Sequence, residues 1–502
     1  MPLTLPSPTG LLAAIDMGSN SFRLEIGQIH GGRYRRHLYL KETVRLGAGL
    51  DDEGMLTEEA TLRGLACLER FRRSLDGVAP SQVRAVATQT LREARNRDAF
   101  LTRATAALGS PIEVISGREE ARLIYAGVSH LQPSRQPRLV VDIGGRSTEM
   151  ILGQGRVPDE AESFQVGSVS LSMRYFGDGR FTPAAFRAAQ IAAGAELEEA
   201  LAAFRPGRWQ EALGSSGTAG AVSEVLAATG RTDGRITPDA LRWLISECIA
   251  AGSADQLDLP GLKPERRAVV GGGLAILYTL ATHFRIDELL PAKGALRQGV
   301  IVDLHDRLMA RHRAHGHDLR DDSVQRLQRR FTVDTAQAHR VRDLALRWHA
   351  QVEPDADAER RNELRWAAEL HEVGQVVSHH DHHRHSAYLV AHVDAAGFSQ
   401  SQQRRVADLV LGQRGGLRKM DEALARHDMA WQLLCLRLAV IKAHARGPVN
   451  LQAIHLTRQG QIAKLSWQPD WPASHPRTLH LLREEAEAWS RSGMLAVELP
   501  AA

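Results

Sequence analysis

Two short turns of small polar residues are the first places in this sequence where chemistry could occur. The first turn follows an apolar run ending at Asp16 and comprises Gly18, Ser19, Asn20 and Ser21. The second follows an apolar run ending at Asp142 and comprises Gly144, Gly145, Arg146, Ser147 and Thr148. Glycine lets the backbone approach an anion closely, and successive N–H groups with serine hydroxyls can surround a phosphate. Both turns are therefore predicted to bind phosphate.

Carboxylates accompany both turns. Asp16 precedes the first turn, and Asp142 and Glu149 bracket the second. Mg²⁺ is held in proteins by one or two carboxylates together with phosphate oxygens of the substrate. These acids are therefore predicted metal ligands, for Mg²⁺ or alternatively Mn²⁺. Either turn alone is a weak signal because Gly/Ser hairpins are common, whereas two turns with acids at matching positions form a strong one.

The two turns belong to an internal duplication. Residues 15–27 (IDMGSNSFRLEIG) and 141–153 (VDIGGRSTEMILG) align at one fixed shift. Four residues recur in this alignment, namely Asp16 as Asp142, Gly18 as Gly144, Ser21 as Ser147 and Gly27 as Gly153. Coincidence between glycine-rich turns is the alternative. Duplication is favoured, and it predicts two related lobes that face each other.

The segment ISGREEARLIYAG (115–127) places two adjacent acids where a strand gives way to a helix. Ser116 and Glu119 have the S-x-x-E spacing of a capping box, in which both side chains bond the first N–H groups of a helix. Glu120 lies outside this box, so its carboxylate is available to activate water. The ordinary alternative is an exposed first-turn acid stabilised by the helix dipole, and local sequence alone favours it.

The segment TQTLREA (88–94) has the same pattern after another strand. Thr90 and Glu93 have T-x-x-E spacing and predict a second capping box. Arg92 lies in the same first turn, where backbone N–H groups already attract anions. Arg92 is therefore a candidate phosphate ligand, and the alternative is a solvated surface arginine.

The elements that must position these residues indicate an α/β front half. Short apolar runs at 83–88, 111–116 and 139–144 end in turn residues, and helical segments lie between them. From 311 to 347 the chain has nine Arg and no Lys or Glu, and helical periodicity takes over. Helices are predicted at 361–377, 401–412, 428–445 and 476–491, with paired strands at 451–458 and 462–467. The predicted domains are two α/β lobes at 11–127 and 128–308, an all-α domain at 309–427 and a small α+β domain at 428–502.

Composition excludes several classes of protein. The chain has 502 residues of which 43% are hydrophobic, enough for more than one core, and its net charge of +4 is not extreme. Its three cysteines lie far apart, which argues against a disulfide framework or a Cys-based zinc site and fits a reduced cytosol. MPLTLPSPTG lacks a basic n-region, and no apolar run approaches the roughly 20 residues of a membrane span. Neither a signal peptide nor a transmembrane segment is expected.

Seven motifs occur in order: AAIDMGSNSFRLEI, ATQTLREA, EVISGREEARLIYAGV, VVDIGGRSTEMILG, LGSSGTAGA, LRWAAELHEVG and HRHSAYLV. Together they resemble the exopolyphosphatase and guanosine pentaphosphate phosphohydrolase family, which belongs to the actin-like, sugar-kinase and chaperone-ATPase superfamily. The resemblance covers nearly the whole chain. It implies two RNase H-like lobes with the active site in the cleft between them, followed by an HD-like helical domain without HD chemistry.

The resemblance also implies residue roles. These are a general base at Glu120, metal and phosphate ligation at Asp142 and Glu149, phosphate loops at 18–21 and 144–148, and a phosphate contact at Arg92. One departure concerns the second loop, which in the family usually reads D-I-G-G-G-S-T-E, whereas the third Gly is Arg146 here. If this position needs a positive φ, the arginine is strained. If it does not, Arg146 adds a phosphate contact.

Histidines gather in the helical part. Seven of them fall between 371 and 392, and the pair His371-Glu372 stands where HD-type phosphohydrolases carry a His-Asp pair. The remaining ligands of such a site cannot be placed from the sequence. A working metal site is therefore not expected there, because a motif without its structural context is weak evidence.

Arginines supply a second candidate binding surface. Arg326, Arg329 and Arg330 share one helical face through i, i+3, i+4 spacing. They form a candidate track for a polyanion, together with Arg340, Arg342, Arg347 and the histidines. A solvated face is the default alternative, and a long anionic substrate would favour the track.

These observations predict an exopolyphosphatase that hydrolyses the terminal phosphoanhydride bond of inorganic polyphosphate with Mg²⁺. Conversion of guanosine pentaphosphate to the tetraphosphate would use the same catalytic residues and stays open. A nucleotide-binding sensor or kinase is the rival from another class, but a sensor is expected to lack Glu120 and no acceptor-side catalytic Asp of a kinase is found. We expect a cytoplasmic homodimer that requires no nucleic acid, with peripheral membrane association as an alternative.

Overall fold

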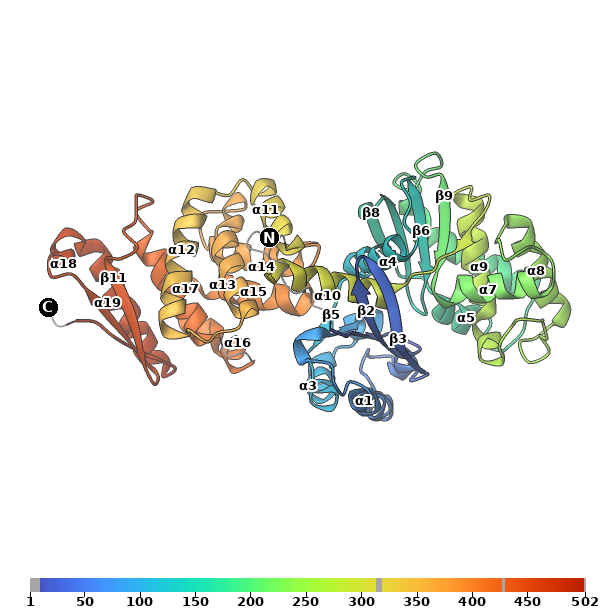
Figure 1. Ribbon diagram of the computed structural model, residues 1–502, viewed down its shortest axis with the longest axis horizontal. Coiled ribbons are helices and arrows are strands. Elements are labelled where there is room, and N and C mark those ends of the chain that lie inside the picture. Colours follow the sequence, from blue (N-terminus) through green and yellow to red (C-terminus); the bar gives the residue numbers. More distant parts are fainter. Residues whose placement is uncertain (1–9, 313–317, 427–428, 501–502) are drawn as a thin grey trace, which may run out of the picture. The chain divides into compact units, whose positions relative to one another are not determined.

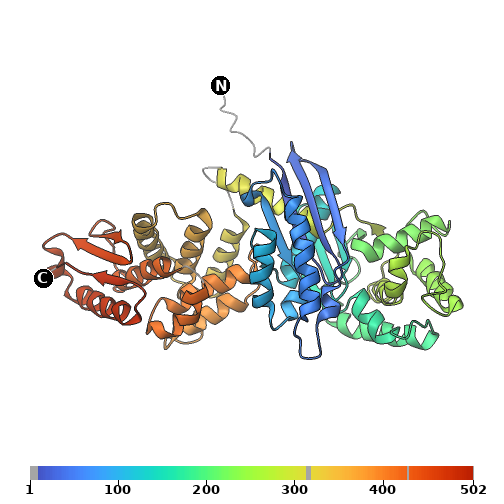
Figure 2. The ribbon, with the colours of Figure 1, turned by 90° about the horizontal axis from the view of Figure 1, so that it is seen from below.

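The computed structural model describes residues 10–312, 318–426 and 429–500. The chain divides into two compact units, Met1–His317 and Asp318–Ala502, and each has its own hydrophobic core. Figures 1 and 2 show the strands and helices of each unit from two directions. In the described part of the chain, no helix is both long enough and apolar enough to cross a membrane.

The first unit, Met1–His317, is called the front unit and contains two lobes. The first of them, lobe I, is built on a five-stranded sheet with strand order β3-β2-β1-β4-β5. Its strands are β1 (Leu12–Met17), β2 (Phe22–His30), β3 (Arg33–Glu42), β4 (Val83–Ala87) and β5 (Ile112–Val114). The first three pair antiparallel, and β4 and β5 continue the sheet in parallel from β1. Helices α1 (Glu58–Arg73) and α3 (Arg97–Leu108) bury Leu68, Phe71 and Phe100 against one face of the sheet.

The second lobe repeats this topology, with strand order β10-β9-β6-β7-β8. Its strands are β6 (Arg138–Ile143), β7 (Thr148–Gln154), β8 (Val157–Phe164), β9 (Glu211–Ser215) and β10 (Leu290–Pro291). Its helices are α5 (Ser168–Tyr175), α6 (Pro183–Leu197), α7 (Ser216–Ala228), α8 (Pro238–Ala251) and α9 (Arg267–His283). The register shifts between Ile26 and Gly27 in one lobe and between Leu152 and Gly153 in the other. Because these irregularities fall at duplicated positions, the structure confirms the predicted duplication.

Two helices pack between the sheets of the two lobes. They are α4 (Gly117–Leu131) and α10 (Leu296–His312), and their apolar residues share one cluster with strand residues of both lobes. Their backbones meet at two glycines, because a Cβ on Gly299 would lie 1.7 Å from the Leu123 carbonyl and one on Gly127 would lie 2.7 Å from the Gly299 nitrogen. No larger residue fits at this crossing, so the glycines fix how closely the two helices approach.

The start of α4 places the two adjacent acids in different surroundings. The Ser116 hydroxyl accepts a hydrogen bond from the Glu119 backbone N–H at 3.2 Å, which is the predicted N-cap. The Glu119 carboxylate, however, forms two 2.8 Å hydrogen bonds with Arg122. It belongs to a buried network in which Asp303 of α10 accepts from both Arg84 and Arg122. Glu119 therefore has a larger structural role than a cap.

We predict that Glu119→Gln lowers the free energy of unfolding by about 3 kcal/mol or more, the loss typical of breaking a buried ion pair. Glu59, whose side chain is 86% exposed in its ion pair with Arg63, supplies the matched control. Glu59→Gln is expected to change the free energy of unfolding by less than about 1 kcal/mol. Urea titrations of both variants measure the difference, and equal small losses would contradict the network.

The second unit consists of helices followed by a small sheet. Its helices are α11 (Leu319–Arg330), α12 (Thr335–Val352), α13 (Ala358–Leu370), α14 (His382–His392), α15 (Gln400–Gly412), α16 (Asp421–Arg426), α17 (Ala430–Lys442), α18 (Trp471–Ser474) and α19 (Pro476–Ser492). The sheet has the order β11-β12-β13, formed by β11 (Ile454–Gln459), β12 (Ile462–Trp467) and β13 (Ala496–Glu498). The predicted hairpin at 451–467 is confirmed by the antiparallel register of β11 and β12.

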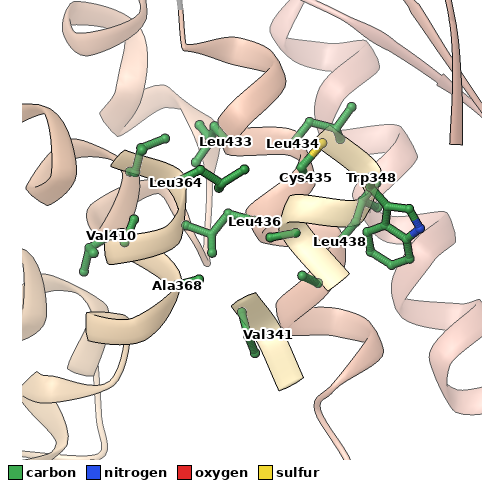
Figure 3. Close-up of a cluster of buried hydrophobic side chains, with 14 of the residues drawn as sticks. Val341, Trp348, Leu364, Ala368, Val410, Leu433, Leu434, Cys435, Leu436 and Leu438 are labelled. Carbon is green, nitrogen blue, oxygen red and sulfur yellow. The ribbon is translucent and has the colours of Figure 1, made fainter. Parts of the chain in front are cut away.

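Helix α17 lies at the centre of this unit's core. Leu433, Leu434 and Leu436 are fully buried and pack with Trp348 of α12 and Leu364 of α13 (Figure 3). The same cluster extends to strand residues of the small sheet. One continuous core therefore serves both the helices and the sheet, and the predicted boundary near residue 428 stays a prediction.

The helix predicted at 361–377 is shorter in the structure. Helix α13 ends at Leu370, and a separate 3₁₀ turn covers Val373–Val376. Gly374 approaches α14 so closely that a Cβ would lie 2.3 Å from the Ser386 nitrogen, and its N–H donates to the Ser386 hydroxyl. This backbone contact takes the place of continued helical hydrogen bonding, which apolar periodicity alone does not reveal.

Candidate active site between the two lobes

A cleft of about 370 Å³ separates the two lobes of the front unit. Both predicted phosphate loops line it, with Gly18, Ser19, Asn20 and Ser21 on one side and Gly144, Gly145, Arg146 and Ser147 on the other. Asp16, Glu120 and Asp142 also line the cleft. Thr148 and Glu149 lie behind this lining, where they are 0% and 1% exposed. The structure thus gathers the candidates of both duplicated turns at one place.

Hydrogen bonds to the loop carbonyls hold both turns in place. The carbonyls of Ser19 and Asn20 accept from the N–H groups of Gly47 and Arg45. In the second lobe, Gly144 and Gly145 accept from N–H groups in the first turn of α5. Ser21 adds a hydroxyl that is buried and has no hydrogen-bond partner among the described residues. Fixed loops with an unsatisfied hydroxyl suit an anionic ligand, because such groups need no reorganisation when the ligand arrives.

Glu120 lies in the cleft wall against Arg92. The residue is 8% exposed, and Arg92 Nη1 donates to Glu120 Oε2 at 2.9 Å. Burial raises the pKa of Glu120 to about 7, although the Arg92 charge opposes this shift. A carboxylate with a pKa near neutrality is a stronger base than an ordinary surface glutamate. The geometry therefore removes the alternative of an exposed first-turn acid.

Arg92 contacts Glu120 and its neighbours, and its predicted contact with phosphate stays a prediction. Its guanidinium donates to Glu120, to the Ile115 carbonyl and to the Gln89 side chain, and Arg92 does not contribute to the lining of the cleft. The contacts assign it to holding Glu120. The second predicted capping box is wrong, because α2 (Gln89–Glu93) begins one residue before Thr90 and has no side-chain cap.

Asp142 and Glu149 form an acidic pair on the lobe II hairpin. They are register partners on β6 and β7. Burial raises the pKa of Glu149 well above its usual range, and the charges of Glu120 and Asp142 raise it further. Burial also raises the pKa of Asp142, against hydrogen bonds from Ser216 and Ser215. These oxygens fit a hard divalent cation, whose charge would relieve the repulsion among them.

In lobe I, the negative charge of Asp16, the counterpart of Asp142, is already compensated by an arginine. Arg23 stands where lobe II has Glu149, and its Nη1 donates to Asp16 Oδ2 at 2.9 Å. Arg297 of α10 lies 3.7 Å from the same oxygen. Asp16 therefore fits a metal less well than its counterpart Asp142. Among the described residues, no group of three or more His, Cys, Asp or Glu forms a cation site by itself, so a bound Mg²⁺ would share its coordination with substrate oxygens and water.

Arg146 is unstrained in its loop. Its φ is not among the positive values found in the described part of the chain. Its Nη2 forms a 2.7 Å ion pair with Glu93 of lobe I, and its side chain lines the cleft. The strain alternative is therefore wrong, whereas direct contact between Arg146 and phosphate stays a prediction.

Sequence reasoning missed most of the basic residues that line the cleft. Besides Arg146 these are Arg23, Arg36, Lys41, Arg266, Lys293 and Arg297. Burial lowers the pKa of Lys41, and the charges of Arg266 and Arg23 lower it further. Repulsion among these three cations indicates that this part of the cleft carries an excess of positive charge. The duplication could have revealed one of these residues, because Arg23 occupies the position in lobe I that Glu149 occupies in lobe II. The other cations are scattered along the sequence.

The second unit contains the remaining candidates. Arg326, Arg329 and Arg330 are exposed on α11, on the side opposite the buried Val324 and Leu327. Their predicted common face is confirmed, and the polyanion track stays a prediction. His371 is fully buried, and its Nδ1 lies 2.7 Å from the Ala368 carbonyl oxygen, a hydrogen-bonding arrangement that fits a structural histidine.

Comparison with known proteins places this fold and site in a family. The Ppx/GppA phosphatase family model matches residues 29–308, and the model for Ppx/GppA phosphatase domain III matches residues 319–486. The chain therefore belongs to the Ppx/GppA phosphatase family.

Solved structures agree with this assignment. An exopolyphosphatase from Cytophaga hutchinsonii is 25% identical with a TM-score of 0.54, and the match covers 59% of this chain and 98% of that one. An exopolyphosphatase-like protein is 26% identical with a TM-score of 0.53, covering 60% and 99%. The Aquifex aeolicus PPX-GPPA enzyme is 25% identical with a TM-score of 0.50, covering 58% and 99%. The front unit thus has the two-lobed, actin-like fold that was predicted.

We predict that Glu120→Gln lowers phosphate release by about 10²- to 10⁴-fold, the usual cost of removing a general base. The substitution keeps the shape of the side chain and its contact with Arg92, so the melting temperature and substrate binding are expected to change little. Asp239→Asn, at an exposed first-turn acid of α8 outside the cleft, is the control and should keep full activity. Near-normal turnover of Glu120→Gln would remove Glu120 from the mechanism.

Proposed function

We propose that this protein is an exopolyphosphatase, which releases orthophosphate from the end of inorganic polyphosphate with the help of Mg²⁺. The observation that carries the proposal is the charge of the cleft. Seven basic side chains and two phosphate loops surround a space whose acidic lining residues are Asp16, Glu120 and Asp142. A substrate with several adjacent phosphates matches such a surface, because each phosphate meets its own cation or loop.

In the proposed reaction, the terminal phosphate lies between the two loops. Their N–H groups and hydroxyls bind its oxygens and stabilise the charge that develops there. Glu120 accepts a proton from a water molecule whose oxygen attacks the phosphorus in line with the bond that breaks. The bond to the bridging oxygen opens, and the shortened chain leaves as an anion. Mg²⁺ at Asp142 and Glu149 would neutralise negative charge on the phosphate oxygens.

The polymer is favoured over guanosine pentaphosphate for two reasons. Exposed arginines on α11 provide a surface that a long polyanion can use and a nucleotide does not need. The apolar cavity next to the cleft, which shares Gly217, Thr218 and Arg266 with it, has a volume of about 20 Å³. That volume suits about one water molecule, so this cavity does not extend the cleft enough to hold a purine base.

A side-by-side assay tests the substrate. Phosphate release is measured from polyphosphate and from guanosine pentaphosphate at equal phosphate concentrations. The proposal predicts a higher kcat/KM for polyphosphate. Hydrolysis of guanosine pentaphosphate alone would assign the sister activity, and binding of either compound without turnover would favour the sensor. The homodimer and the cytoplasmic location stay predictions.

We predict that Mg²⁺ raises the melting temperature of the protein and that chelation abolishes phosphate release. The metal would bind the folded cleft and offset the repulsion among its carboxylates, and binding to the folded state alone stabilises it. Asp142→Asn should lose most of the Mg²⁺-dependent thermal shift, whereas Asp239→Asn should keep it. Full activity after exhaustive chelation, or an unchanged shift in Asp142→Asn, would contradict the metal assignment.

We also predict that the α11 arginines hold long chains without taking part in the chemistry. Reversal of charge at Arg326, Arg329 and Arg330 should weaken the binding of long polyphosphate and reduce its dependence on salt concentration, because fewer counterions are released on binding. Turnover of short chains should be unchanged. A triple variant that degrades long chains normally, with an unchanged salt dependence, would show that these arginines form only a solvated face.

A further inference from the structure

A continuous chain of side-chain contacts connects the second phosphate loop to Glu120. Arg146 Nη2 donates to Glu93 Oε2 at 2.7 Å, and Gln89 Nε2 donates to Glu93 Oε1 at 2.6 Å. Gln89 Oε1 accepts from Arg92 Nε at 3.0 Å, and Arg92 Nη1 donates to Glu120 Oε2 at 2.9 Å. Each of the three middle side chains therefore bonds a neighbour on either side.

The chain of contacts crosses from one lobe to the other at its first step. Arg146 follows β6 in lobe II, whereas Glu93, Gln89 and Arg92 belong to α2 in lobe I. The Arg146 side chain lies over Gly47 of lobe I, where a Cβ would come within 3.1 Å of Arg146 Cδ. The ion pair therefore forms only while the two lobes are close together at this edge of the cleft.

The contribution of this ion pair to stability is small. The side chains of Arg146 and Glu93 are 29% and 31% exposed, and ion pairs with such access to water contribute little to the free energy of folding. Its effect on orientation is larger, because Glu93 accepts Arg146 with one oxygen and Gln89 with the other. Gln89 is thereby held in the rotamer that binds Arg92.

We propose that Arg146, Glu93 and Gln89 are positioning residues that align Glu120 through Arg92 when the lobes close. This rests on the role proposed above for Glu120 as the general base. A glycine at position 146 could not form the ion pair with Glu93, so this link between the lobes depends on the arginine in the loop of this chain. Closure of the cleft then also orients Glu120 for catalysis.

The experiment compares four variants on short-chain polyphosphate with Mg²⁺: Arg146→Gly, Glu93→Gln, the double variant and Arg146→Lys. Arg146→Gly and Glu93→Gln should each lower kcat by about 10- to 100-fold, the scale expected for a misplaced catalytic group. The KM of Glu93→Gln should stay within about twofold of the wild type, because Glu93 does not line the cleft. The double variant should be no worse than either single one, because both substitutions cut the same link. Arg146→Lys should restore most of kcat, since lysine can still reach Glu93.

Arg103→Ala is the matched control, since Arg103 forms a similar surface ion pair with Glu58 inside lobe I. It should keep wild-type kcat and KM. Melting temperatures of all variants should stay near that of the wild type, which separates loss of alignment from loss of folding.

Two outcomes would overturn the proposal. A raised KM with unchanged kcat in Arg146→Gly would make Arg146 a substrate ligand and not a positioning residue. Effects of the two single variants that multiply in the double variant would show that they do not act through one link. If the wild type fails to hydrolyse polyphosphate, or Glu120→Gln keeps full turnover, the proposed function fails instead.

Discussion

Burial of three carboxylates, two lining the cleft and Glu149 behind the lining, is the constraint on which the rest of this site depends. Glu120, Asp142 and Glu149 are 8%, 6% and 1% exposed. Burial raises the pKa of each, and the charges of Glu120 and Asp142 raise that of Glu149 further. Grouped buried acids are costly unless positive charge compensates them. Arg92 supplies one such charge, and a divalent cation bound together with phosphate would supply more.

The two lobes meet this constraint in different ways, although they share one topology. In lobe I the hairpin acid Asp16 is paired with Arg23, and Arg297 is held nearby by the buried Glu25. In lobe II the matching hairpin carries Glu149 opposite Asp142, so the register partner of this acid is a second carboxylate instead of an arginine. One duplicated scaffold thus presents a neutralised side and a side that fits a metal, which gives the cleft a polarity that a symmetric pair of lobes would lack.

Local patterns in the sequence were sufficient for much of the fold. The recurrence of Asp16 and Gly18 at a fixed shift predicted the paired hairpins, and S-x-x-E spacing predicted the cap at Ser116. Each hairpin, and the cap at Ser116, is formed by residues close together in the chain. Their partners elsewhere were not predictable in this way. Glu119 is held in a network with Asp303 of α10, a residue far along the sequence.

The candidate site likewise combines residues that local patterns identify with residues that only the folded chain brings together. Glu120 was identified because a local rule left it without a structural role, yet its pKa depends on burial that only the folded lobes create. The predicted Thr90–Glu93 box is wrong because α2 already begins at Gln89, and Glu93 bonds Arg146 of the other lobe. The basic lining was missed because its residues come from β2, β3, α10 and two connecting segments. Contacts between distant segments, and the charge they collect, require the three-dimensional structure.

The position of the terminal phosphate tests the account most directly. A crystal structure of the Glu120→Gln variant with short-chain polyphosphate and Mg²⁺ would show it. The account predicts the terminal phosphate between the loops at 18–21 and 144–148, with the side chain of residue 120 facing the phosphorus on the side opposite the bridging oxygen. A terminal phosphate bound outside these loops, or a chain lying with its middle units at residue 120, would contradict it.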